Sequence, residues 1–202
     1  EKDSFDPGRG AELLTLAARD GGAEAAALMA VLCGAGVCRT QSWDDALDYL
    51  QQASERGWAS AQAQLKLLCA DDDLQERSDG IPDRDVHAWR RLREAVSIAD
   101  WIDAPARDVI LETPRIRKID GFVSKAVCRW LIESARERLE RARIYFPVGG
   151  GPAINPSRTN TETDFNIVQS DLVLLLVRAR IAAATGLPPS VKCFTEPLVS
   201  VD

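Results

Sequence analysis

Two stretches of this chain carry the same pattern of apolar and small residues at a fixed spacing of 36 residues. Residues 13–25 align with residues 49–61. The matched pairs are Leu13 with Tyr49, Leu14 with Leu50, Ala17 with Ala53, Gly21 with Gly57, Ala23 with Ala59, and Ala25 with Ala61. Within each stretch the apolar positions fall at spacings typical of a buried helix face. A recurrence of this length indicates helical hairpins stacked side by side.

Glycines mark the expected ends of these helices. Gly21 and Gly57 stand where one helix of each pair should end, and a glycine there can take a left-handed capping conformation. The segment Gly34-Ala35-Gly36-Val37 is expected to form the turn from the first hairpin to the second. The alanine two residues after each capping glycine would let neighbouring helices approach closely.

A third, incomplete copy is expected to follow at an offset of 42 residues. The aligned pairs are Ala46 with Ala88, Leu47 with Trp89, Leu50 with Leu92, and Ala53 with Ala95. The acidic, glycine-containing segment 71–80 can accommodate the longer spacing. Asp83 is a candidate N-cap for the helix that carries Trp89.

The repeat pattern resembles SEL-one-like repeats, relatives of the tetratricopeptide repeat. The matching stretches are Cys33-Gly34-Ala35-Gly36-Val37 and Ala53-Ser54-Glu55-Arg56-Gly57-Trp58-Ala59-Ser60-Ala61-Gln62. The resemblance implies antiparallel helix pairs, a geometry often used to bind other proteins. The alternative is a helical platform that only supports its neighbour.

Composition limits the partners that this chain could have. Hydrophobic residues make up 46% of the 202 residues, which predicts a real core in one large domain or two small ones. The net charge of −6 argues against a general nucleic-acid surface. The longest apolar run, Leu172–Val177, is too short to span a bilayer, and no signal peptide opens the chain. We therefore expect a cytoplasmic protein with neither nucleic acid nor membrane as partner.

The cysteines and the histidine give little sign of a metal site. Five scattered cysteines indicate reduced thiols. Cys33 and Cys38 are expected to be packed thiols rather than zinc ligands, because no second pair and no histidine lies near them. His87, the only histidine, is expected to be a solvated or packed residue, and one histidine cannot complete a two-histidine site.

The pattern changes near residue 105. Ala104-Pro105-Ala106-Arg107-Asp108 has the composition of a linker, and Val109, Leu111, Ile116 and Ile119 alternate with polar residues as in strands. We therefore predict a helical repeat domain over residues 1–104 and a second domain over residues 105–202.

The second half mixes helices, strands and a long loop. Ser124 and Asp171 are candidate N-caps, and Gly186 is the expected end of the second helix. The first helix should bury Val127, Leu131, Ile132, Ala135 and Leu139 and expose a run of arginines and glutamates paired at four-residue spacing. The segment 147–164 is expected to be a flap-like loop, since its three glycines lack the context of a phosphate site. Residues 198–201 are expected to form a further strand.

The motifs of this half, taken in order, resemble the prolyl 4-hydroxylase family of iron(II)/2-oxoglutarate dioxygenases. They are Ile119-Asp120-Gly121-Phe122-Val123-Ser124, Ser157-Arg158-Thr159-Asn160, Arg180-Ile181-Ala182, Thr185-Gly186-Leu187-Pro188 and Glu196-Pro197-Leu198. The resemblance implies an α+β chain, in which the helical repeats precede an incomplete double-stranded β-helix (a jelly roll) with flanking helices. It also implies iron(II) and 2-oxoglutarate as cofactors of a complete enzyme.

On the family pattern, the iron-binding His-x-Asp should follow Asp202. The expectation is that this chain holds no catalytic residue and no metal ligand, and that alone it binds neither iron nor 2-oxoglutarate tightly. An open set of two histidines and one carboxylate is what leaves iron positions for 2-oxoglutarate and oxygen.

The resemblance also supplies candidate substrate-binding residues, namely Arg158, Thr159, Asn160 and Glu196. Arg158 could bind a substrate carbonyl or carboxylate through two hydrogen bonds, or it could anchor its loop through an ion pair with Glu162 or Asp164. Glu196 could line the active site or be a surface acid at the start of a strand. The resemblance therefore implies that the chain is part of a dioxygenase that hydroxylates a protein or peptide, with a prolyl residue as the expected target. The alternative is a non-enzymatic adaptor whose repeats bind a protein partner.

Overall fold

The protein combines helices with short strands. The computed structural model describes residues 6–69, 74, 80–82, 84–146, 150–154, 156 and 158–187. Within these residues there are eight α-helices, and the antiparallel strands pair two by two without closing into a barrel. The expectation of a mixed helical and sheet fold is confirmed at this level. The jelly roll and the assignment to SEL-one-like repeats stay predictions.

Contacts divide the chain into two compact units. The first, here called the helical unit, comprises residues up to 122 together with 170–189, and the second, the strand unit, comprises 123–169 together with 190–202. The predicted boundary near residue 105 stays a prediction. The structure adds that a helix from the second half of the sequence belongs to the helical unit.

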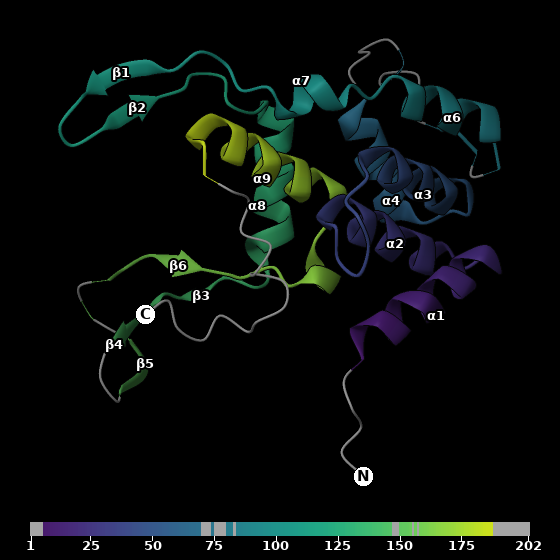
Figure 1. Ribbon diagram of the computed structural model, residues 1–202, viewed down its shortest axis with the longest axis horizontal. Helices are drawn as coiled ribbons and strands as arrows, with labels where there is room; N and C mark the ends of the chain where they lie inside the picture. Colours follow the sequence, from purple (N-terminus) through teal and green to yellow (C-terminus); the bar gives the residue numbers. More distant parts are fainter. Residues whose placement is uncertain are drawn as a thin grey trace. The chain divides into compact units, whose positions relative to one another are not determined.

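Two helical hairpins form the start of the helical unit (Figure 1). The first pairs α1 (Pro7–Arg19) with α2 (Ala23–Ala35), and the second pairs α3 (Trp43–Glu55) with α4 (Ala59–Leu68). Both α3 and α4 begin 36 residues after their counterparts α1 and α2. The starts of these helices therefore follow the spacing of the sequence pattern.

The same capping arrangement ends α1 and α3. Gly21 and Gly57 have φ angles of 99° and 81°, in the left-handed region that favours glycine. Two backbone hydrogen bonds close each cap. At the end of α1, Gly22 N–H donates to Ala17 O (2.9 Å) and Gly21 N–H donates to Ala18 O (3.2 Å). At the end of α3, Trp58 N–H donates to Ala53 O (3.0 Å) and Gly57 N–H donates to Ser54 O (3.0 Å). This is the Schellman pattern, and it confirms the caps predicted from sequence.

The turn between the hairpins begins two residues later than predicted and continues to Ser42. Helix α2 extends to Ala35, and Gly36 and Cys38, with φ angles of 69° and 58°, take the left-handed conformation. Gly34 is therefore a helical residue. A Cβ atom there would lie 2.9 Å from Leu172 Cδ1 and 3.2 Å from Leu175 Cδ1. The glycine that sequence reasoning assigned to a turn instead permits close approach of a distant helix.

Two further helices continue the helical unit. Helix α6 (Val86–Glu94) has Asp85 as its N-cap, and the candidate cap Asp83 lies outside the described residues. Its residues Ala88, Trp89 and Leu92 are buried like the residues of α3 with which the sequence aligns them. Helix α7 (Ile98–Ile102) begins after the capping residue Ser97.

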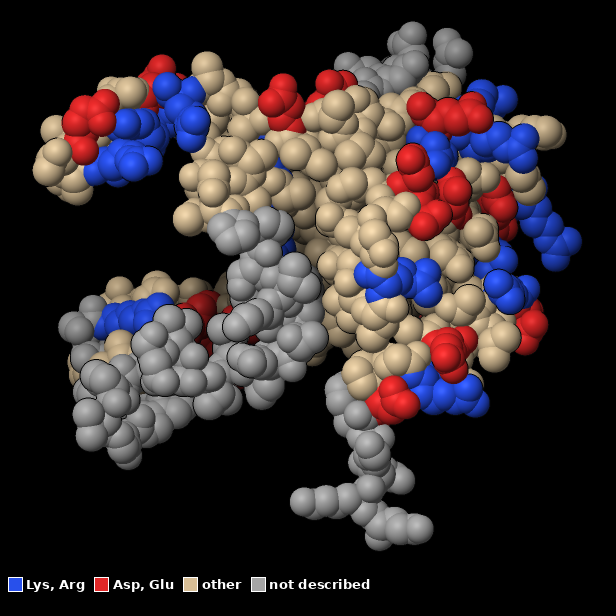
Figure 2. Space-filling model, in the orientation of Figure 1, with Lys and Arg blue, Asp and Glu red and all other residues tan. Residues whose placement is uncertain are grey.

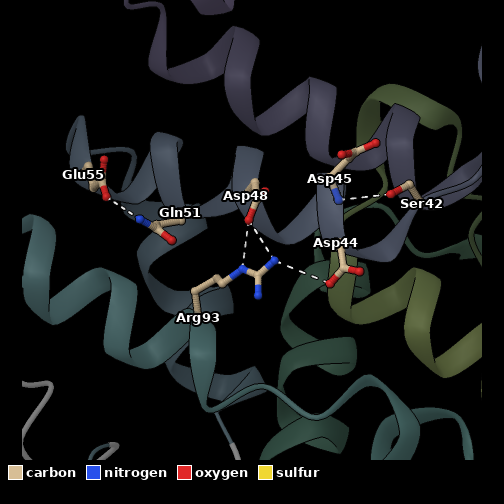
Figure 3. Close-up of polar contacts among 7 residues, drawn as sticks. All are labelled: Ser42, Asp44, Asp45, Asp48, Gln51, Glu55 and Arg93. Atoms are coloured by element: carbon tan, nitrogen blue, oxygen red, sulfur yellow. Dashed lines mark hydrogen bonds and ion pairs between the residues drawn. The ribbon is translucent and has the colours of Figure 1, made fainter.

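Helix α6 is joined to α3 by charged side chains (Figure 3). Arg93 donates through Nε to Asp48 Oδ1 at 2.9 Å, and its Nη2 lies 3.5 Å from Asp44 Oδ1. The carboxylates are exposed, so each pair contributes about 1 kcal/mol or less. Acidic and basic side chains are interspersed over this face of the helical unit (Figure 2).

Helix α9 (Leu172–Thr185) completes the helical unit, although more than 60 residues separate it from α7 in sequence. It packs against α2, α4 and α7. Leu172, Val173 and Leu176 are fully buried. As predicted, the helix begins after Asp171, whose side chain accepts a hydrogen bond from Leu174 N–H at 2.7 Å, and it ends at Gly186.

Polar contacts hold both ends of α9. At its start, Leu172 N–H donates to Gln64 Oε1 of α4 at 2.8 Å in a buried hydrogen bond. Near its end, Arg107 Nη1 donates to Ala184 O at 2.6 Å. Arg180 Nη1 donates to the carbonyls of Asp100 and Trp101, at 2.8 Å and 3.0 Å, which lie near the C-terminus of α7. Each contact satisfies a backbone group that a helix end leaves free.

Replacing Gln64 by leucine should destabilise the helical unit by about 1–3 kcal/mol, because the buried Leu172 N–H would lose its acceptor. The free energy of unfolding in urea measures this effect. A suitable control is Gln52→Leu, whose side chain accepts only one long hydrogen bond from Arg56 at 3.3 Å. An effect of Gln64→Leu no larger than that of the control would contradict the capping role.

A β-hairpin joins α7 to the strand unit in sequence. Strands β1 (Asp108–Leu111) and β2 (Ile116–Lys118) lie where the alternating pattern predicted strand, although Ile119 falls outside β2, and they pair antiparallel. Their apolar side chains are largely exposed, with Val109, Ile110, Leu111 and Ile116 all among the exposed hydrophobic residues.

The strand unit begins with α8 (Lys125–Arg136), which has Ser124 as its N-cap, as predicted. Of the predicted apolar face, Val127 is buried, whereas Ile132 and Leu139 are exposed. The helix ends at Arg136, so the later charged residues do not share its face. The pair that does form on it, Glu133 with Arg136, is three residues apart rather than four.

No helix in the described part of the chain is both long and apolar enough to cross a membrane. Cytoplasmic localisation stays a prediction.

Candidate functional site

The candidate substrate-binding segment lies beside two small sheets of the strand unit. Strand β3 (Glu140–Arg141) pairs with β6 (Thr161–Glu162), and β4 (Arg143–Phe146) pairs with β5 (Gly150–Ile154). Residues 158–160 lead directly into β6, and Ala142 N–H donates to Asn160 O at 3.1 Å. The long loop predicted over residues 147–164 thus contains two strands, which form through backbone pairing rather than through an alternating sequence pattern.

Arg158 is bound on all three of its nitrogen atoms. Nε donates to Asn160 Oδ1 at 3.1 Å, Nη1 donates to Arg143 O at 2.7 Å, and Nη2 donates to Glu162 Oε2 at 3.0 Å. The other carboxylate oxygen of Glu162 accepts from Arg143 N–H at 3.0 Å. Of the two roles open to Arg158 from sequence, the loop-anchoring ion pair with Glu162 is the one that forms.

The structure describes only some of the remaining candidate residues. Thr159 and Asn160 are exposed beside the Arg158 anchor. Ser157 and Glu196 lie outside the described residues. Within the described chain, the motif therefore presents a threonine and an asparagine side chain to solvent on a segment whose shape is fixed by Arg158.

A cleft of about 490 Å³ opens next to this anchor. Its lining residues are Glu137, Arg138, Glu140, Arg141, Arg143, Glu162, Thr163, Asp164 and Gln169. Glu162 belongs to both features, since it binds Arg158 and lines the cleft. The cleft carries charges of both signs, which suits a polar ligand with its own hydrogen-bonding groups better than an apolar one.

The arginines of the cleft were not singled out by the sequence. Arg138 stacks over the ring of Phe165 at 4.4 Å and donates to the carbonyl of Ser134. Arg141 Nη2 donates to Arg158 O at 3.3 Å, so it too supports the anchor segment. The run of arginines and glutamates, which includes Arg138 and Arg141, was predicted to lie on the exposed face of the helix that begins after Ser124. For Arg138 and Arg141 that prediction is wrong, because α8 ends before them. The signal available in the sequence was the density of arginines after the helix.

The residues of this chain do not fit the iron site of a dioxygenase. In the described residues no three His, Cys, Asp or Glu side chains form a group suited to a metal ion. His87, the one histidine of the sequence, is exposed on α6. Iron with two histidine ligands would need residues that these 202 do not supply.

The thiols of the helical unit divide into buried and exposed ones. Cys33 and Cys69 are buried, whereas Cys38 is exposed. Burial raises the pKa of the Cys33 thiol above its ordinary value, and the hydrogen bond from Arg39, at 3.2 Å, acts in the opposite direction. The protonated, enclosed thiol of Cys33 should be unreactive.

The rates of cysteine alkylation should differ between the buried and the exposed thiols. We expect a neutral maleimide at pH 7.5 to modify Cys38 and Cys128, both exposed, at least about tenfold faster than Cys33 and Cys69. Peptide mass spectrometry over a time course measures the four rates, and the same reaction in 6 M guanidinium chloride provides the control. Labelling of Cys33 at the rate of Cys128 in the native protein would contradict the described packing.

Comparison of the chain with protein-family models, with curated proteins and with solved structures gives no match. The resemblances to the prolyl 4-hydroxylase family and to SEL-one-like repeats therefore rest on the motifs of the sequence.

Proposed function

We propose that this chain is the recognition and support part of an iron(II)/2-oxoglutarate dioxygenase that hydroxylates a protein or peptide, with a prolyl residue as the expected target. The observation that carries the proposal is the position of α9. This helix holds Arg180-Ile181-Ala182, one of the motifs that resemble the family, and it packs into the core of the helical unit. A helical array and a dioxygenase-like segment that share a core are expected to act together.

In this proposal the helical unit is a support. Hydrogen bonds fix α9 at three places. Gln64 binds its start and Arg107 binds its end. Between them, Arg180 of α9 binds carbonyls near the C-terminus of α7. A helix held in this way provides a rigid element on which a site can be built. Rigid supporting elements keep substrate-binding groups close to the positions that catalysis requires.

Substrate recognition is assigned to the segment 158–160 and its surroundings. Arg158 acts as a positioning residue, because its guanidinium is already bound to Asn160, Arg143 and Glu162. The exposed side chain of Thr159 and the free face of Asn160 then offer hydrogen bonds to a peptide backbone. Glu196 is retained as a candidate from the resemblance alone.

Iron and 2-oxoglutarate would be held by residues other than those of this sequence, and they would supply the oxidising chemistry. The contribution of this chain is confined to binding and orienting the substrate. The 202-residue chain alone should therefore bind 2-oxoglutarate no better than an unrelated protein.

The test compares this chain with the longest polypeptide that its gene encodes. Each is incubated with iron(II), 2-oxoglutarate, ascorbate and a panel of proline-containing peptides, and succinate release is measured together with the mass of the peptide. We expect succinate and a 16 Da mass increase with the longer polypeptide only. A reading frame that ends after Asp202, or saturable 2-oxoglutarate binding by the 202-residue chain, would contradict the proposal.

The second candidate is a non-enzymatic adaptor that binds a protein through its helices. The engagement of Arg158 within its own segment favours it, since the guanidinium has no nitrogen left without a partner for a substrate. A longer polypeptide that binds peptides but releases no succinate would support this candidate instead.

A further inference from the structure

Two side chains bind both backbone groups of Arg143, the first residue of β4. Glu162 Oε1 accepts from Arg143 N–H at 3.0 Å, and Arg158 Nη1 donates to Arg143 O at 2.7 Å. The other carboxylate oxygen of Glu162 accepts from Arg158 Nη2 at 3.0 Å. These three hydrogen bonds form a closed ring, which we call the Arg143 ring.

The Arg143 ring reproduces the bonds that a neighbouring strand would make. In an antiparallel ladder, a hydrogen-bonded pair of residues exchanges both N–H···O=C bonds. At Arg143 the guanidinium of Arg158 takes the place of the neighbour's N–H, and the carboxylate of Glu162 takes the place of its C=O. Arg143 lies opposite Ile154 of β5, but Glu162 accepts the hydrogen of its N–H. The ring therefore occupies the edge of β4 that faces away from β5.

Opening the Arg143 ring requires little free energy. The side chains of Arg158 and Glu162 are 40% and 42% exposed, and an ion pair this accessible contributes about 1 kcal/mol or less. A peptide backbone offers an N–H and a C=O, so it can replace the two bonds to Arg143 with two bonds of the same kind. The net change is then mainly the loss of the exposed ion pair.

A cleft provides room for an incoming chain at the same place. Arg143 and Glu162 both line the cleft of about 490 Å³ described above. Its volume lies within the range of about 300–1,000 Å³ that is typical of ligand sites. The hydroxyl and amide side chains of Thr163 and Gln169 also line it, and such groups can bond to a peptide backbone.

We propose that the Arg158–Glu162 pair occupies the position of a peptide strand: an extended peptide pairs with Arg143 at the edge of β4, takes over both of its hydrogen bonds and releases the two side chains. Main-chain pairing at the edge of a sheet is a recurring mode of peptide recognition. The released guanidinium of Arg158 then binds a carbonyl or carboxylate of the peptide. Arg158 thus anchors its segment in the chain without peptide and contacts the substrate in the complex.

This mode of binding restricts the substrate. The inference rests on the proposed function only for the class of ligand, a protein or peptide. The peptide residue that pairs with Arg143 must donate an N–H group to Arg143 O, and proline has none. A prolyl target therefore lies beside the pairing residue and not at it.

The test uses the 202-residue chain without iron or 2-oxoglutarate. The probes are end-blocked peptides in which a central residue, each amino acid except proline in turn, is flanked by Thr-Val-Thr on either side. Binding is followed through the Arg143 backbone amide and the Arg158 Nε–H in ¹⁵N NMR spectra. We expect saturable shifts of both signals with at least one probe.

Backbone methylation of the best probe tests the pairing itself. A single N-methyl group moved along the peptide should weaken binding at least about tenfold at one position and leave it within about twofold at the two neighbouring positions. Neighbouring N–H groups of an extended chain point in opposite directions, so only one of them can face Arg143. Equal tolerance of the methyl group at every position would overturn the inference.

Glu162→Gln separates a displaceable pair from a permanent part of the site. Its amide oxygen can still accept from Arg143 N–H, but the ion pair with Arg158 is lost, so the peptide should bind about two- to fivefold more tightly. The control Glu133→Gln breaks the exposed pair of Glu133 with Arg136 on α8 and should leave binding unchanged.

Two further results would overturn the inference: no saturable shift with any probe, and binding by Glu162→Gln that is unchanged or weaker. Neither depends on succinate release, so the proposed function can stand if peptide pairing fails. Conversely, a reading frame that ends after Asp202 would contradict the proposed function and leave peptide pairing as a property of this chain.

Discussion

Replacing Leu176 by alanine is expected to destabilise the helical unit by about 2–5 kcal/mol. Leu176 of α9 is fully buried in the core that α9 shares with α2, α4 and α7. The substitution removes buried methyl and methylene groups and leaves a cavity that close-packed neighbours fill only in part. The midpoint and slope of urea unfolding, followed by far-ultraviolet circular dichroism, give the change in the free energy of unfolding.

Ile181→Ala is the matched control for this substitution, since Ile181 belongs to the same helix and is 46% exposed. Its effect should stay within about 0.5 kcal/mol. If Leu176→Ala and Ile181→Ala cost the same, then α9 does not share the core of the hairpins, and the packing described for it is wrong.

Gly34→Leu is expected to cost about 1–3 kcal/mol or more, because it overfills the contact between α2 and α9. A Cβ atom alone at Gly34 would lie 2.9 Å from Leu172 Cδ1 and 3.2 Å from Trp43 Cζ3. A leucine adds three more carbon atoms where Leu172, Leu175 and Trp43 already meet. Urea unfolding measures the loss, and tryptophan fluorescence reports the displacement of neighbours such as Trp43.

Gly34→Ala separates steric overlap from helix propensity. Alanine gains about 1 kcal/mol over glycine in a helix interior. The added Cβ would displace Leu172 Cδ1, Leu175 Cδ1 and the ring atom Trp43 Cζ3, which offsets part of that gain. Its net effect should therefore be within about 1 kcal/mol of zero. A stabilising effect of Gly34→Leu would contradict the close approach of α9 to α2.

Local patterns predicted the local structure well. The 36-residue spacing placed the hairpins, and the N-caps Ser124 and Asp171 and the left-handed glycines at 21, 57 and 186 were all identified from neighbouring residues. These features depend on hydrogen bonds within a few residues, so the sequence contains the whole of the information that forms them.

Contacts between distant parts of the chain were not predictable in this way. Gly34 was assigned to a turn because glycines are frequent in turns, and its contact is with a helix more than 130 residues away. Nothing in the sequence indicates that the Gln64 side chain accepts a hydrogen bond from Leu172 N–H. A single sequence shows which faces are apolar, but it does not show which of several apolar faces meet.

The sequence singled out the segment around Arg158 as a candidate, but not the contacts that Arg158 makes or the cleft beside it. The pairing of Arg158 with Glu162 was one of two alternatives that the residues allowed, and the structure distinguishes them. The cleft lined by Arg138, Arg141 and Arg143 depends on where α8 ends and on the pairing of strands that are only two to five residues long. Strands β3, β5 and β6 leave too little alternation in the sequence to be recognised.

The proposal that the helices support the dioxygenase-like segment requires that α9 and the hairpins unfold as one unit. Native-state hydrogen exchange in increasing urea tests this requirement most directly, with amides of α9, such as those of Leu175 and Leu176, compared with amides of α2, such as those of Ala30 and Val31. We expect the two groups of amides to converge on one free energy of opening. The substitution Leu65→Ala, in the buried face of α4, should lower this free energy by the same amount in both groups. Opening of α9 at a much lower free energy, unaffected by Leu65→Ala, would show that it is a separate element and would contradict the account.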